Sequence, residues 1–121
     1  MTEKAIVITT DNEISIQDLE VKDGSLLESL QQIVGGYIET VRPMRLGGGL
    51  LMIVNEEGLL QNLPVNAVGS FLYGADCHGN PIVGTIAIVD RGYRHGEPDL
   101  VGLSPLLAQE LLNLFLKIFY I

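Results

Sequence analysis

The chain has 121 residues, of which 47% are hydrophobic and 18% are charged, and its formal net charge at pH 7 is −8. A chain of this length forms one domain, here residues 1–121, and the high apolar content excludes intrinsic disorder. The acidic balance disfavours proteins that track nucleic-acid phosphates, because those need a basic surface.

Three features indicate the compartment. Cys77 is the single cysteine, so the sequence offers no internal disulfide and favours a reducing environment. The N-terminal residues M-T-E-K-A-I-V-I-T-T lack the basic and long apolar regions of a signal peptide. The most apolar segment, near the C-terminus, is interrupted by polar residues and is too broken for a membrane span. We therefore expect a cytoplasmic protein.

The first part of the chain predicts two strands and a helix. Residues 4–9 are rich in β-branched side chains, and residues 14–16 alternate between apolar and polar, as half-buried strands do. In D-G-S-L-L-E, Ser25 is predicted to accept a hydrogen bond from the backbone N–H three residues on, while Glu28 reaches back. Apolar residues at helical spacing continue to Val34, and two glycines end the helix.

The middle of the chain predicts strands joined by tight turns. The strands are expected at residues 37–41, 50–54 and 59–60, with a turn at Glu56-Glu57-Gly58. Asn66 is placed to cap a helix over residues 67–73, and Gly74 to end it.

The last part predicts a buried strand over residues 82–89, a polar and mobile surface connection over 90–102, and a final helix. Ser104 caps that helix and Pro105 occupies its first turn. Apart from a narrow polar stripe the helix is very apolar, which favours sharing it with a second copy in a homodimer. The residues expected at that interface are Leu112, Phe115 and Phe119.

Together these elements predict an α+β domain. A mixed or mainly antiparallel sheet of four to five strands is expected to pack against two or three helices.

Four motifs occur in a recognisable order: V-G-G-Y-I-E at 34–39, V-N-E-E-G at 54–58, L-P-V-N at 63–66 and G-N-P-I-V-G at 79–84. In this order the chain resembles the domain of unknown function 3846 family, small proteins of phages, plasmids and other mobile elements. The resemblance covers residues 4–90 and leaves 91–121 outside it. It implies a mobile-element protein in a bacterial cytoplasm, and by analogy one that counteracts a host defence factor by binding it. It brings no catalytic residues and no cofactor.

Catalytic chemistry has little support in the sequence. A nucleophile such as Cys77 needs an activating base, which His78 or His95 would have to supply, with Asp76 or Asp99 as orienting group. One cysteine and two histidines are too few for a zinc site, so no metal is expected. A small hydrolase is therefore the least favoured function.

Anion binding is a further possibility. Gly47–Gly49 lacks the following helix and the Lys-Ser/Thr pair of a phosphate loop, so a flexible connection is favoured. Arginine recognises phosphate in a fork geometry, and the alternative is surface pairing with the abundant acids. The basic residues considered for an anion site are Arg42, Arg45, Arg91, Arg94 and Lys117.

Acidic residues are concentrated before residue 30, where seven of the fifteen fall. They form either a solvated face that keeps the protein soluble or a surface that imitates nucleic acid or docks on a basic partner. The residues chosen for the docking surface are Asp18, Glu20 and Asp23.

Polar residues between the two middle apolar runs suggest a pocket for a small nucleotide-like signal, close to the dimer interface. The alternative is structural, since each asparagine there also suits a turn or a cap. Adjacent Glu56 and Glu57 point apart in a turn and make a poor acid/base pair. The residues expected to bind the ligand are Tyr37, Arg42, Arg45, Asn55, Asn62 and Asn66.

Overall fold

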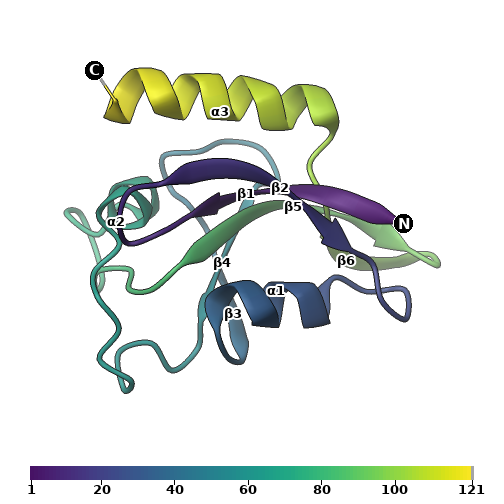
Figure 1. The fold of residues 1–121 in the computed structure, drawn as a ribbon, viewed down its shortest axis with the longest axis horizontal. Coiled ribbons are helices and arrows are strands. Elements are labelled where there is room, and N and C mark those ends of the chain that lie inside the picture. The colour runs from purple at the N-terminus through teal and green to yellow at the C-terminus, as the bar shows by residue number, and fades with distance from the viewer. Residues whose placement is uncertain (121) are drawn as a thin grey trace.

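Two hairpins and a long strand between them make up the sheet. The computed structural model describes residues 1–120. The strand order is β2-β1-β5-β4-β3 with all neighbours antiparallel, and β6 pairs with the distal half of β5 (Figure 1). The strands are β1 (Thr2–Ile8), β2 (Ile14–Glu20), β3 (Ile38–Val41), β4 (Leu51–Asn55), β5 (Ile86–Arg94) and β6 (Glu97–Val101). The α+β class and the antiparallel sheet are confirmed, with six strands in place of four to five.

Helices cover both faces of this sheet. Helix α3 (Pro105–Phe119) lies over β1 and β2 on one face, and α1 (Leu27–Val34) lies on the other (Figure 1). Side chains of the central strands alternate between two cores. In β5, Ile86 and Ile88 belong to the core on the α3 side, whereas Ala87 belongs to the core on the α1 side. A strand covered on both faces has no polar side, which explains the unbroken apolar run.

Helix α1 begins in a different way from the prediction. Ser25 Oγ accepts from the N–H of Leu27 at 3.0 Å, two residues on, and Glu28 lies 3.5 Å from Lys22 Nζ. Backbone hydrogen bonds in both directions between Lys22 and Ser25 hold the serine in a two-residue turn before the helix. The predicted capping box is therefore wrong. The helix does end at Gly35, with φ of 80° in the left-handed region.

Helix α2 (Ala67–Tyr73) matches its prediction. Asn66 Oδ1 accepts from the N–H of Gly69 at 2.8 Å, and Gly74, at φ 88°, ends the helix. Residues 59–60, in contrast, form no strand. They lie in consecutive turns, where the N–H of Leu63 donates to the carbonyl of Gly58 at 3.0 Å.

Residues 90–102 form strands instead of an irregular connection. The strand expected over 82–89 begins at Ile86 and continues to Arg94, which pairs with Glu97 of β6. The two residues between them, His95 and Gly96, both have positive φ (52° and 79°), as a type I′ hairpin turn requires. This hairpin lies at the end of the molecule opposite α2 (Figure 1).

Helix α3 begins as predicted and contributes to the core of its own chain. Ser104 Oγ accepts from the N–H of Leu107 at 3.1 Å, and Pro105 occupies the first turn. None of the helices within residues 1–120 combines the length and apolar content that crossing a bilayer would take.

The residues chosen for a dimer helix do not share one exposed face. Phe115 has no exposed surface and packs in the core, so its assignment to an interface is wrong. Phe119 and Leu112 are both half-buried. The Phe119 ring packs edge-on against the Phe71 ring, with the ring centroids 5.7 Å apart. The exposed apolar side chains of the helix are Leu106, Leu114, Leu116 and Ile118.

Candidate functional site

A cleft of about 520 Å³ opens at the β3 edge of the sheet. Its walls come from four parts of the chain: β3 with the end of β4, the turns of residues 56–60, Tyr73 at the end of α2, and the loop of residues 79–83. Volumes of this size hold small ligands or a few side chains of a partner. Of the six residues predicted for a pocket, Asn55 alone lines this cleft.

Asn55 shapes the cleft but has its polar atoms engaged within the chain. It is buried, and its Oδ1 accepts from the N–H of Glu57 at 2.8 Å. Its Nδ2 donates to the carbonyl of Val34 at 3.1 Å and to Gln61 Oε1 at 3.3 Å. The side chain thus fixes the turn after β4 against the end of α1, and its role is structural.

Two of the other predicted ligand residues also have structural roles. Asn66 has no exposed surface, and its Nδ2 donates to the carbonyls of Ile8 and Gly84 at 3.0 and 2.9 Å. Its assignment to a binding site is wrong, because no polar atom is left to face a ligand. Asn62 is exposed in a turn at φ 54°, where asparagine is well tolerated.

Tyr37 and Arg42 are exposed and do not line the cleft.

Arg45 and Arg94 are each paired with an acid, as the ion-pairing alternative expected. Arg45 holds Asp76 through two hydrogen bonds of 2.7 and 2.9 Å, and its guanidinium lies 4.3 Å above the centre of the Phe71 ring. These hydrogen bonds lower the pKa of Asp76 from 3.8 to about 2. Arg94 makes a similar fork with Glu3. The five basic residues therefore do not form one anion site.

The cleft has an acidic and apolar lining. Glu39 and Glu56 contribute carboxylates, and no lysine or arginine lines it. Leu59 and Leu60 in the adjoining turns line it as well, with 55% and 82% of their surface exposed. Large apolar side chains this exposed beside a cleft are typical of a binding surface.

Sequence reasoning missed these lining residues. It placed Leu59 and Leu60 in a strand. The one signal that could have found part of the lining is the alternation of β3, which puts Glu39 and Val41 on the same face.

The opposite edge of the sheet is the strand β2, seven residues long. The N–H of Val21 donates to the carbonyl of Met1 at 3.0 Å, which fixes the phase of the antiparallel β1–β2 ladder. Every second residue of β2, counted back from Glu20, therefore points its backbone N–H and C=O groups away from β1. Ser29 Oγ in fact donates to the outward carbonyl of Glu20 at 2.7 Å. The remaining outward groups of β2 form an open edge.

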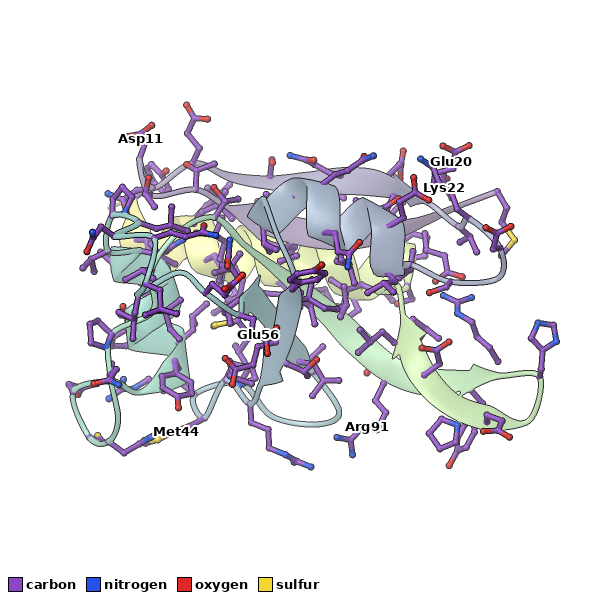
Figure 2. The ribbon with its side chains drawn as sticks, turned by 90° about the horizontal axis from the view of Figure 1, so that it is seen from below. Asp11, Glu20, Lys22, Met44, Glu56 and Arg91 are labelled. Carbon is purple, nitrogen blue, oxygen red and sulfur yellow. The ribbon has the colours of Figure 1, made fainter. Side chains whose placement is uncertain are left out.

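Carboxylates outnumber bases along this edge. Lys4 pairs with Asp18 at 2.8 Å and Lys22 with Glu28 at 3.5 Å, so both local lysines are already engaged. Figure 2 shows Asp11 and Glu20 projecting from the same long side of the molecule, with Arg91 on the other. Within residues 1–120, the carboxylates of this edge without an ion pair are Asp11, Glu13, Glu20 and Asp23.

The candidate catalytic residues are not assembled. Cys77 Sγ lies 3.7 Å from Asp76 Oδ2, while His78 Nε2 is 3.2 Å from the carbonyl of Tyr73. His95 sits in the β5–β6 turn, at the far end of the molecule from the loop after α2. Among residues 1–120, no three His, Cys, Asp or Glu side chains form a group that could hold a metal ion.

Comparisons with known proteins add a family and a fold. The model of the family described as "Domain of unknown function (DUF3846)" matches residues 1–116. A search of curated proteins found no match. The solved structure described as "Crystal structure of small RNA methyltransferase HEN1" is similar with a TM-score of 0.59 and 16% sequence identity. The likeness covers 93% of this chain but 16% of that protein, and at this identity it concerns the fold alone.

Proposed function

The chain belongs to the family described as domain of unknown function DUF3846, and from this premise we propose that it is a non-catalytic binding protein of a phage or other mobile element. It acts in the bacterial cytoplasm, where it counteracts a host defence factor by docking on it through the acidic edge of β2. The observation that carries the proposal is the group of carboxylates without an ion pair in and beside β2: Glu20 ends the strand, and Asp11, Glu13 and Asp23 lie in the turns on either side of it.

The chemistry of this edge selects a basic partner. Unpaired carboxylates on one side of a protein with net charge −8 attract a basic surface and accelerate its encounter. Once the partner is close, the outward N–H and C=O groups of β2 offer hydrogen bonds to an extended segment. Glu20 and Asp23 contribute more than Asp18, whose charge is offset by Lys4.

A phage-plating assay tests the proposal. The chain is expressed in bacteria carrying single defence systems, and rescue of plaque formation identifies the system that it inhibits. The double variant Glu20→Lys/Asp23→Lys should lose at least about tenfold of that rescue, because two attractive charges become repulsive. Glu97→Lys/Glu110→Lys is the matched control, since both sites are exposed, lie outside β2 and its flanking turns, and change the net charge equally.

Rescue by the edge variant at the wild-type level would contradict the proposal. So would equal loss in both double variants, because that result would indicate net charge and not the edge. Failure of the chain to restore plaques against any system carrying a basic effector protein would contradict the anti-defence role.

The cleft favours a second candidate, a small-ligand binder. Its volume is within the range of ligand sites. Its two carboxylates and lack of basic side chains oppose a nucleotide phosphate, so a ligand there would carry a positive charge.

Homodimerisation remains a separate proposal, now placed on the exposed apolar side chains of α3. Leu106 and Leu114 are the largest contributors with 70% and 44% of their surface exposed.

A further inference from the structure

We propose that the free edge of β3 and the adjoining cleft bind an extended peptide segment of another protein, added antiparallel as the next strand of the sheet. The segment carries a basic and an apolar side chain two residues apart, both directed into the cleft. This site is on the opposite edge of the sheet from β2 and does not depend on the function proposed above.

The backbone of β3 offers hydrogen bonds on its outer side. The N–H of Glu56 donates to the carbonyl of Tyr37 at 2.8 Å, which fixes the phase of the antiparallel ladder. Two residues on, Glu39 therefore also exchanges hydrogen bonds with β4, whereas Ile38 and Thr40 turn their N–H and C=O groups away. Within residues 1–120, no strand lies beyond β3.

The side chains of β3 connect this edge to the cleft. Glu39 and Val41 lie on one face of the strand and line the cleft, while Ile38 packs in the core on the α1 side. In an antiparallel pair, directly opposite side chains lie on the same face, about 5 Å apart. Peptide residues opposite Glu39 and Val41 therefore enter the cleft, and they are two positions apart.

The lining decides which side chains fit. A lysine or arginine opposite Glu39 would also approach the carboxylate of Glu56, and its charge would be offset by both. An apolar side chain opposite Val41 would be covered by the exposed Leu59 and Leu60. Burial of such exposed leucines supplies the apolar part of the binding free energy.

Self-association through this edge is disfavoured. Two copies of β3 paired antiparallel would bring the Glu39 carboxylates together, and like charges across strands repel. The same carboxylate attracts a basic strand, so the edge disfavours a second copy of this chain and favours a partner of opposite charge. β3 is short and carries a charge, as edge strands protected from pairing do. It also adjoins the exposed Leu59 and Leu60 of the cleft, which offer apolar surface to a partner.

Fluorescence anisotropy with a labelled peptide tests the proposal. The probe is Thr-Lys-Thr-Val-Thr-Lys-Thr, which places lysine and valine on one face and threonine on the other. We expect saturable binding with Kd of about 10–100 μM, typical of a short unconstrained strand. The same peptide with glutamate in place of lysine should bind at least about tenfold more weakly.

Backbone contacts are tested with matched changes on both partners. Thr40→Pro removes an outward N–H but no ladder hydrogen bond, and should weaken binding at least about tenfold. Thr40→Val keeps that N–H and should bind within about twofold. N-methylation of the probe's threonines removes the N–H groups that face β3, whereas N-methylation of its lysines and valine leaves them intact and should have little effect.

Several results would overturn the proposal. They are no saturable binding up to about 1 mM peptide, equal binding by Thr40→Pro, or equal binding of both methylated peptides. Loss of binding in Glu20→Lys/Asp23→Lys would show that the peptide binds at the β2 edge and not at the β3 edge. If circular dichroism shows that Thr40→Pro does not fold, the two methylated peptides on the wild-type protein decide.

Discussion

Arg94 and Glu3, ninety-one residues apart, face each other in a two-pronged ion pair, with nitrogen-to-oxygen distances of 2.7 and 3.0 Å. Both side chains are largely buried, at 13% and 18% exposed. Glu3 also accepts from the N–H of Gly102 at 2.8 Å. This pair fastens the β5–β6 hairpin to the first strand of the sheet.

Glu3→Gln should lower the free energy of unfolding by about 2 kcal/mol, because the buried Arg94 loses its closest carboxylate, while its ion pair with the more exposed Asp99 is longer, at 3.5 Å. Glu97→Gln, an exposed change in the same hairpin, should cost under about 0.5 kcal/mol. Urea denaturation at pH 7 measures both. Equal midpoints for the two variants would show that the pair contributes nothing.

The same pair predicts acid sensitivity. The hydrogen bond from Arg94 lowers the pKa of Glu3 below its ordinary value of 4.5. A lowered folded-state pKa means that the stabilisation is complete above 4.5 and is lost as the pH falls through the lowered value. Wild type and Glu3→Gln should therefore converge in stability at pH values well below 4.5, and parallel curves down to acid unfolding would contradict the assignment.

Arg45 should control the titration of Asp76. With the pKa of Asp76 lowered to about 2, its stabilising effect is present above 3.8 and lost as the pH falls toward 2. Arg45→Lys removes the fork and the contact with the Phe71 ring, so the carboxyl pKa should rise toward 3.8. Carbon-detected NMR titration follows this directly. Arg42→Lys is the control and should leave the Asp76 titration unchanged.

Asn66→Asp tests the hydrogen bonds that the Asn66 amide donates in the core separately from its capping of helix α2. Aspartate keeps an acceptor for the N–H of Gly69 but directs a carboxylate at the carbonyls of Ile8 and Gly84. We expect a loss of about 3 kcal/mol or more, because a buried charge meets two acceptors. Asn12→Asp, at an exposed turn, should be nearly neutral in thermal unfolding. If Asn66→Asp also melts like wild type, the two amide hydrogen bonds are not needed.

Gly102→Ala should destabilise the protein through close packing. A Cβ at this position would lie 2.5 Å from the Glu3 side chain and 2.8 Å from the backbone nitrogen of Lys4. The neighbouring strand would have to shift, at a cost of about 2–3 kcal/mol. Gly47→Ala meets no atom within 4 Å and should be neutral. Differential scanning calorimetry compares the two, and equal melting temperatures would contradict the close approach.

Substitutions on the buried and exposed sides of helix α3 test its roles in folding and in dimerisation separately. Phe115→Lys should abolish folding, because it buries a charge in the core. Leu114→Lys changes an exposed side chain and should leave a folded protein. If the helix forms a homodimer by its outer face, light scattering should show dimeric wild type and monomeric Leu114→Lys. Monomeric wild type would end the dimer proposal.

Local signals in the sequence predicted the helices well. Asn66 and Gly74 bracket α2, and Ser104 with Pro105 starts α3, because caps and turn residues act over two or three positions. The same local reasoning failed at Ser25, because this residue lies in a turn just before the helix and does not cap it.

What the sequence missed depends on distant contacts. The part of the β5–β6 ribbon from Asp90 to Val101 is polar and contains no buried residue, and the turn that folds it is a His-Gly pair instead of the more familiar Asn-Gly. The cleft is lined by four separate parts of the chain, so no single stretch of sequence predicts it. Phe115 was placed on an interface because an apolar helix can be covered by its own sheet or by a second copy, and spacing alone does not distinguish them.

The position of β5 between two hairpins has a consequence for the order of folding. The β1–β2 and β3–β4 hairpins each form from neighbouring residues, but within the sheet they are joined only through β5. During synthesis, both hairpins leave the ribosome before the strand that joins them has been made. Because such long-range pairing is slow, the nascent chain should stay open to chaperones until residues 86–94 have emerged and the sheet can close.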